Sequence, residues 1–217
     1  MYKILFACAS LLVLSSCTTV TLDEHMQQQA SINAGDSIVV LGRRHSSDFE
    51  TEPSFVNCLG KALAKSGLDI NVVPEKTFLD ALYPWVEPRT APRKTEHLSR
   101  LLEHPGVREY LQETKLRYML WLRGNTRETH ATGSLGCTIG PGGGGCFGFG
   151  MWDDESNYEL AIWDIKNQEE IGKVSADAKG TSYMPAVVVP IPLLARVQNN
   201  VCEALSKQLI GFFSSNP

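Results

Sequence analysis

The sequence predicts an α/β fold: a mixed sheet of about five strands with crossover helices, a carboxy-terminal antiparallel hairpin and a long closing helix. Between Ser37 and Leu82, short β-branched runs alternate with helical patterns, which is typical of parallel strands joined by crossover connections. The segments Asn157–Ile165 and Glu170–Lys179 flank a four-residue turn, which predicts the hairpin. From about Leu193 to Phe213, apolar residues recur every three or four positions, as in an amphipathic helix.

The first four elements follow from hydrophobic patterning and from proline and glycine. Ser37–Gly42 is a continuous apolar run, as expected for a strand buried on both faces. Pro53 opens a helix that extends through Lys65, because proline is tolerated at a helix start and Gly67 fits the C-cap region. Leu68–Val73 is a second β-branched strand, and Glu75–Leu82 is a short helix. The order strand, helix, strand, helix favours a parallel arrangement.

The central third of the chain is predicted as a loop, two short helices and a strand. Tyr83–Pro92 contains three prolines and is therefore a loop. His97–Glu103 and Val107–Thr114 have helical patterns. Leu116–Leu122 alternates between two faces and predicts a third strand that continues to about Arg127.

The amino terminus has the features of an export signal. Lys3 supplies a positive charge, and Ile4–Leu14 is an apolar stretch too short to remain in a bilayer as a spanning helix. The following Leu14-Ser15-Ser16-Cys17 resembles the lipobox of bacterial lipoproteins. The resemblance implies that residues 1–16 are removed and that Cys17 carries the lipid. The alternative is an ordinary secretory signal followed by a chance cysteine.

This resemblance also implies a location. Thr18 follows the lipidated position, and the absence of aspartate there favours the inner leaflet of the outer membrane, with the folded part in the periplasm. Residues 17–35 are polar and include Gln27-Gln28-Gln29, so they are predicted to be a lipidated flexible tether. Residues 36–217 are predicted to form a single α/β domain. No transmembrane helix is expected after the signal.

Four cysteines remain after Cys8 and Cys17 are set aside, and an oxidising periplasm favours disulfides between them. Three pairings are possible. Proximity favours Cys137 with Cys146, which leaves Cys58 with Cys202. A zinc site is the alternative, but the sequence has no C-x-x-C pair, so no metal and no cofactor are predicted.

The formal net charge of −4 argues against nucleic acid as a main partner. The least ordinary segment is a glycine-rich insertion at 133–152, predicted to be a disulfide-closed loop. It lacks the lysine-serine ending of a phosphate-binding P-loop. Its large apolar side chains are typical of a partner or membrane contact, although they can also fold back and cover the sheet. The residues predicted to make this contact are Phe147, Phe149, Met151 and Trp152.

Two motifs support a family resemblance over residues 36 to 213. They are the strand Leu-x-Tyr-Met-Leu-Trp-Leu-x-Gly at 116–124 and the hairpin Ile-Trp-Asp-Ile-Lys-Asn-Gln-Glu at 162–169. Together with the element order, they resemble the α/β domain of the curli-secretion (CsgG-like) lipoproteins and of the Tol-system propeller protein, and small proteobacterial lipoproteins. The curli resemblance implies membrane-spanning hairpins, but Asn125–Gly136 is polar at nearly every position and departs from that pattern.

Together these observations predict a non-catalytic, outer-membrane-anchored periplasmic lipoprotein that binds an envelope protein partner and can form homo-oligomers. One alternative is an enzyme that acts on envelope polymers, for which the acidic run Asp153-Asp154-Glu155 supplies the only candidate acids. A second alternative is a subunit associated with a secretion channel.

Overall fold

The computed structural model describes residues 18–43, 51–87 and 97–214. These residues form an α/β structure with a mixed six-stranded sheet in the order β1-β6-β5-β4-β2-β3. The chain separates into two compact units. Unit 1 contains the residues up to Thr19 together with Glu128–Glu155 and Lys179–Val197, and unit 2 contains the remainder. The long central strands contribute residues to both units.

The predicted parallel half of the sheet is confirmed in unit 2. Strand β2 (Asp36–Gly42) pairs in parallel with β3 (Ile70–Val73) and with β4 (Leu116–Gly140). The connection from β2 to β3 contains the helix α2 (Pro53–Ala64), and the connection from β3 to β4 contains α3 (Glu75–Ala81) and two further helices. Since two parallel strands cannot be joined by a tight turn, these helical connections serve as the crossovers that return the chain to the same end of the sheet.

One face of the sheet in unit 2 is covered by short helices. The helices α4 (Leu98–Leu102) and α5 (Pro105–Glu113) join α3 on this side. Trp121 and Trp163 stack in its core with their ring centroids 5.5 Å apart. The core side chains come from four strands and three helices. They include Val39, Leu41, Val73, Met119, Trp121, Ala161 and Trp163 from β2, β3, β4 and β5, and Phe78, Leu98, Leu101, Val107 and Leu111 from α3, α4 and α5.

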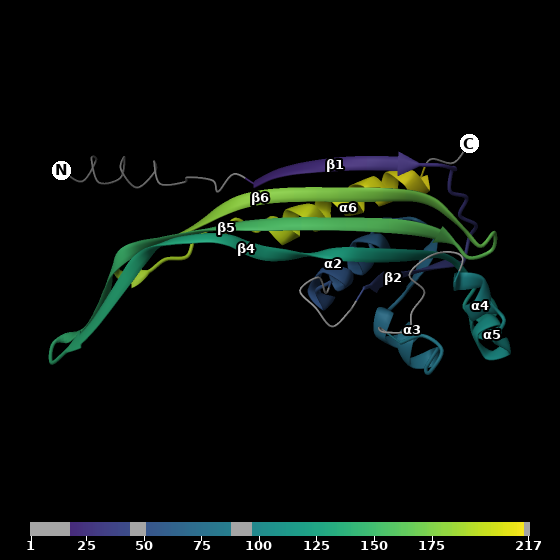
Figure 1. Ribbon diagram of the computed structural model, residues 1–217, viewed down its shortest axis with the longest axis horizontal. Coiled ribbons are helices and arrows are strands. Elements are labelled where there is room, and N and C mark those ends of the chain that lie inside the picture. Colours follow the sequence, from purple (N-terminus) through teal and green to yellow (C-terminus); the bar gives the residue numbers. More distant parts are fainter. Residues whose placement is uncertain (1–17, 44–50, 88–96, 215–217) are drawn as a thin grey trace. The chain divides into compact units, whose positions relative to one another are not determined.

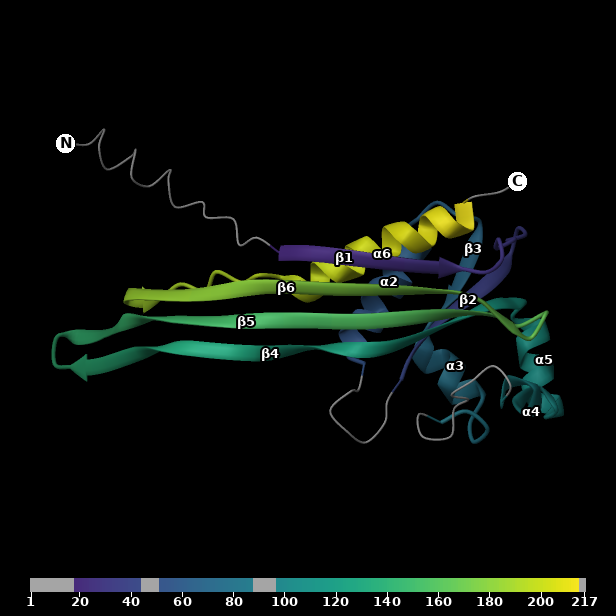
Figure 2. The ribbon, with the colours of Figure 1, turned by 45° about the horizontal axis from the view of Figure 1, so that its top comes forward.

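The other face is covered by α2 and by the closing helix α6 (Val197–Ser214). The disulfide Cys58–Cys202 joins these two helices, which lie side by side (Figures 1 and 2). Phe55 of α2 stacks on Tyr158 of the sheet at a centroid distance of 3.7 Å. The ring of Tyr118 on β4 contacts Phe213 of α6 at a centroid distance of 5.2 Å, so the face of β4 opposite Met119 and Trp121 belongs to this second core.

The glycine-rich insertion is a strand pair and not the predicted loop. Strand β4 continues to Gly140, and β5 (Gly143–Asp164) begins after a two-residue connection. A Cβ at Gly133 would lie 2.2 Å from the carbonyl oxygen of Phe149 in the facing strand. A Cβ at Gly148 would lie 2.2 Å from the carbonyl oxygen of Ser134. These glycines permit the backbones to approach, so their function is close strand pairing and not loop flexibility.

The flexible tether predicted for residues 17–35 is also wrong over much of its length, because Thr18–Met26 is strand β1. It lies beside β6 (Glu169–Pro190) at the edge of the sheet, and the backbone N–H groups of Gln27 and Gln28 donate to the carbonyl oxygen of Ile171. The segment has little apolar periodicity because it is an edge strand with mostly exposed side chains. Its stabilisation comes from backbone pairing with a distant partner, which sequence patterning does not show.

The closing helix begins at Val197 and not near Leu193. The backbone of Leu193 instead makes two hydrogen bonds with Tyr183, at 2.9 and 2.7 Å. Leu194, which the helical pattern placed on the buried stripe, is 56% exposed. The helical spacing of Leu194 relative to Val197 and Val201 was therefore coincidental.

Candidate functional site: the exposed apolar surface of unit 1

Exposed apolar side chains are concentrated in unit 1. Of the thirteen large hydrophobic residues exposed in the described parts of the chain, ten belong to this unit. Soluble proteins rarely leave so many large apolar groups together in water without a binding role. The ten side chains are Leu135, Ile139, Phe147, Phe149, Val187, Val188, Val189, Ile191, Leu193 and Leu194.

The predicted contact residues are all on β5, but they do not form one patch. Phe147 and Phe149 are exposed, by 58% and 46%, and they occupy alternate strand positions on one face with Met151. Trp152 lies on the opposite face. Phe149 also contacts the ring of Tyr183 on β6, with centroids 6.0 Å apart. Met151 and Trp152 are half-buried, so the accessible part of the predicted contact is the pair of phenylalanines.

A disulfide holds the strands that carry these phenylalanines. Cys137 of β4 is bonded to Cys146 of β5, with their Cα atoms 4.0 Å apart. This bond and Cys58–Cys202 correspond to the pairing that sequence proximity favoured. Because Cys146 immediately precedes Phe147, the bridge fixes the register in which the exposed rings are presented.

The acidic run is occupied by contacts with β6. Asp153 accepts a hydrogen bond from the hydroxyl of Thr181 at 2.6 Å, and Asp154 accepts one from Ser182 at 3.1 Å. Glu155 pairs with Lys179 at 2.9 Å. Successive strand residues point to opposite faces, so Asp153 and Glu155 share one face of β5 and Asp154 lies on the other. All three carboxylates are engaged by side chains of β6.

Within the described residues, no group of three or more histidine, cysteine or acidic side chains is arranged to hold a metal ion. None of the helices in these residues has the length and apolar character needed to cross a membrane.

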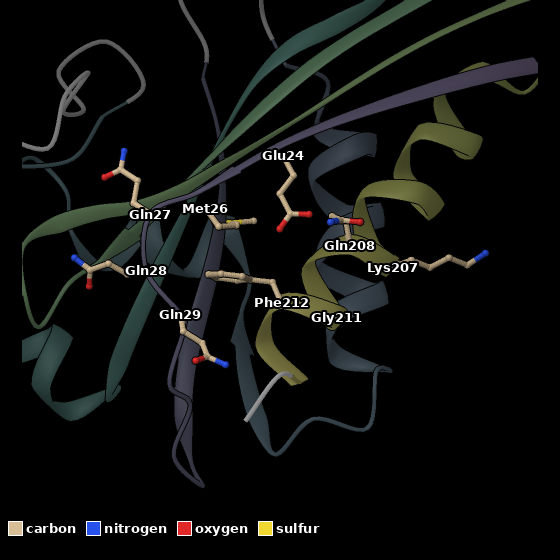
Figure 3. A pocket seen from close by; sticks show the side chains of 9 residues that line it. All are labelled: Glu24, Met26, Gln27, Gln28, Gln29, Lys207, Gln208, Gly211 and Phe212. Atoms are coloured by element: carbon tan, nitrogen blue, oxygen red, sulfur yellow. The ribbon is translucent and has the colours of Figure 1, made fainter. Parts of the chain in front are cut away.

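Unit 2 contains a pocket of about 490 Å³ between the end of β1 and the last turns of α6 (Figure 3). In Figure 3 the ring of Phe212 points toward Met26, and Lys207 extends away from them. Lys207 is bonded to Glu203 at 2.7 Å. The remaining lining is mainly the amide side chains of Gln27, Gln28, Gln29 and Gln208. The carboxylate of Glu24 and the backbone of Gly211 complete the lining of this pocket.

A second depression in unit 2, of about 420 Å³, has a cationic rim over an apolar floor. Its rim includes Arg108, Lys115 and Lys166. The guanidinium of Arg117 lies there as well, but it pairs with the buried carboxylate of Asp164 at 2.6 Å. That pairing organises the β5–β6 turn, because Asp164 also accepts hydrogen bonds from the backbone and side chain of Asn167.

Unit 2 also contains a buried polar network that the sequence did not indicate. The Tyr158 hydroxyl donates to Glu52 at 2.7 Å and accepts from Gln198 at 3.2 Å. Glu52 also accepts from the backbone N–H of Thr126 at 2.7 Å. Burial raises the pKa of Tyr158 well above its ordinary value of 10.0. The network joins the start of α2 to the sheet.

The predicted lipid attachment, Cys17, lies outside the described residues. The next residue, Thr18, is described, and its hydroxyl donates to the carbonyl oxygen of Ala195 at 3.1 Å. Of the run Val187–Leu194, the sequence predicts the first part as a connection and Leu193 and Leu194 as the start of the closing helix, whereas the structure places Val187–Pro190 in β6 and all of the run before α6. The Val-Val-Val-Pro-Ile-Pro-Leu-Leu composition of the run was the available signal for an exposed apolar segment.

Comparisons with known proteins find structural similarity only. The chain is similar to two structures of the PelC dodecamer from Paraburkholderia phytofirmans, one of them a variant, at 14% and 12% sequence identity. The TM-score is 0.40 for both. The matches cover 89% and 92% of this chain and 98% and 100% of the other chains, respectively. No protein-family model and no curated protein sequence matches this chain.

Proposed function

We propose that this protein is a non-catalytic lipoprotein of the cell envelope, anchored in the inner leaflet of the outer membrane through Cys17, that binds a protein partner through Phe147 and Phe149. The observation that carries the binding function is the exposure of these two rings on a disulfide-linked strand pair. Aromatic side chains on a rigid support are effective binding groups, because they bury a large area and lose little conformational freedom.

Binding is favoured over catalysis by the contacts that the candidate acids make within the fold. Each of Asp153, Asp154 and Glu155 already contacts a side chain of β6. The exposed rings of Phe147 and Phe149 are accessible without any rearrangement.

The support for the anchor is the lipobox-like sequence that ends at Cys17. If the lipid is there, the start of β1 determines how many residues separate it from the folded chain. Since β1 begins at Thr18, a lipid on Cys17 is separated from the folded chain by one peptide bond. Such an anchor restrains unit 1 at the membrane surface, in contrast to a long tether, which would allow the protein to sample a large volume.

The test is photo-crosslinking in intact cells with a photoreactive phenylalanine analogue at position 149. The expected result is one predominant protein adduct. The matched control places the same analogue at Tyr83, which is 66% exposed but belongs to unit 2, and we expect no equivalent adduct there. An identical adduct pattern at both positions, or no protein adduct at Phe149, would contradict the proposed partner site.

The anchor has a separate test. Cys17→Ser is expected to abolish lipid attachment and signal removal, which mass spectrometry of the purified protein measures. If the mass of the wild-type protein contains no lipid, the anchoring proposal is wrong, while the crosslinking result still decides the partner site.

A further inference from the structure

The segment Val187–Leu194 consists entirely of exposed aliphatic residues and two prolines. Its six aliphatic side chains are between 38% and 79% exposed, and the other two residues are Pro190 and Pro192. Both flanking alanines, Ala186 and Ala195, are buried, at 3% and 2% exposure. The segment is therefore attached to unit 1 at its two ends, and its side chains project into solvent between them.

The surrounding sequence contains no charge. From Gly180 to Ala195 there is no aspartate, glutamate, lysine, arginine or histidine, although charged residues make up 20% of the whole chain. The first ionisable residues outside this stretch are Lys179 and Arg196. A charged side chain in the hydrocarbon region of a membrane is costly, whereas cations at its edge are attracted by anionic lipid headgroups. The stretch thus has the composition of a surface that enters lipid.

Both ends of the charge-free stretch lie at Thr18. The Thr18 hydroxyl donates to the carbonyl oxygen of Ala195 at 3.1 Å, and a Cβ added to Gly180 would lie 3.1 Å from the same hydroxyl oxygen. Cys17 is the residue that immediately precedes Thr18 in the chain. The predicted lipid attachment is therefore adjacent to the base of the aliphatic segment.

We propose that Val187–Leu194 is a second membrane attachment, which inserts its aliphatic side chains into the lipid layer beside the Cys17 anchor. The choice of lipid as the occupant rests on the anchoring part of the proposed function, since the anchor would hold this segment at the membrane surface. Lipid is favoured over a second copy or another protein because the centres of protein interfaces are enriched in aromatic, methionine and arginine side chains, whereas this segment offers only aliphatic groups and proline.

The experiment uses the mature chain from Thr18, made without lipid, which retains every residue that the structure describes. Binding is measured by co-sedimentation with vesicles of phosphatidylethanolamine and phosphatidylglycerol. We expect the unlipidated chain to bind the vesicles. We expect Ile191→Glu to weaken this binding by about tenfold or more, because placing a carboxylate in the lipid layer costs free energy, and keeping it in water prevents the segment from inserting. Ile191 is 60% exposed, so this substitution leaves the core intact, and thermal unfolding checks that it does.

The matched control is Gln112→Glu, which adds the same charge at an exposed position of α5 in unit 2 and is expected to bind as wild type does. Failure of the unlipidated wild-type chain to bind vesicles, or equal binding by Ile191→Glu, overturns the proposal. Self-association that Ile191→Glu abolishes, in a chain that does not bind vesicles, assigns the segment to a second copy and also overturns it. None of these outcomes depends on crosslinking at Phe149 or on lipidation of Cys17.

Discussion

The two disulfides provide the sharpest stability prediction, because they close loops of very different length. Cys58–Cys202 spans 144 residues, and Cys137–Cys146 spans 9. Restricting the unfolded chain by a cross-link stabilises the folded state by an amount that grows with the logarithm of loop length. The chain-entropy relation gives about 5 kcal/mol for the long loop and about 2.7 kcal/mol for the short one.

The perturbation is the pairwise replacement of each bridge, Cys58→Ala with Cys202→Ala and Cys137→Ala with Cys146→Ala. For a urea dependence of about 2 kcal/mol per M, the unfolding midpoint falls by about 2.5 M for the first pair and about 1.3 M for the second. Equilibrium unfolding followed by far-ultraviolet circular dichroism measures both midpoints. Wild-type protein unfolded in reductant is the control, because it loses both bonds and keeps the cysteine side chains.

The comparison of the two losses of stability tests the loop-closure explanation. If loss of Cys137–Cys146 destabilises the protein more than loss of Cys58–Cys202, loop closure in the unfolded chain does not determine the contribution of these bonds.

Three further predictions concern unfolding. Gly133→Ala is expected to destabilise the protein by about 2 kcal/mol or more, because its φ of +107° and the facing carbonyl exclude a side chain, whereas Gly142→Ala, with open space around it, changes stability little in the same urea titration. Asp164→Ala breaks a buried ion pair and should cost about 3–5 kcal/mol, while Asp80→Ala removes an exposed pair and should cost less than about 0.5 kcal/mol; equal costs would contradict this assignment. Because Tyr158 keeps its proton in the folded state above pH 10, where the unfolded state loses it, stability should fall as pH rises past 10, and Tyr158→Phe should show a shallower decline.

The sequence alone determined the α/β class and the order of most elements. The run Ser37–Gly42 and the Pro53 helix start were sufficient to predict β2 and α2, because burial on both faces and the geometry of proline are local constraints. Alternation along Leu116–Leu122 likewise predicted the two faces of β4, which the two helical layers cover. The sequence also identified Phe147 and Phe149 as candidates for a partner contact. This signal is local too, since large apolar side chains among glycines have few neighbours in sequence to pack against.

Only the tertiary structure decided the features that depend on a distant partner. Thr18–Met26 is a strand because β6 supplies its backbone partners, and a polar sequence contains no local signal of that pairing. Gly133 and Gly148 belong to strands because the facing carbonyl oxygens occupy the space of a side chain, and glycine by itself is equally compatible with a loop. The same holds for the contact of Thr18 with Ala195, which are 177 positions apart and bring the predicted anchor to the aliphatic segment. Hydrophobic periodicity reports burial along one element, whereas these contacts result from the pairing of separate elements.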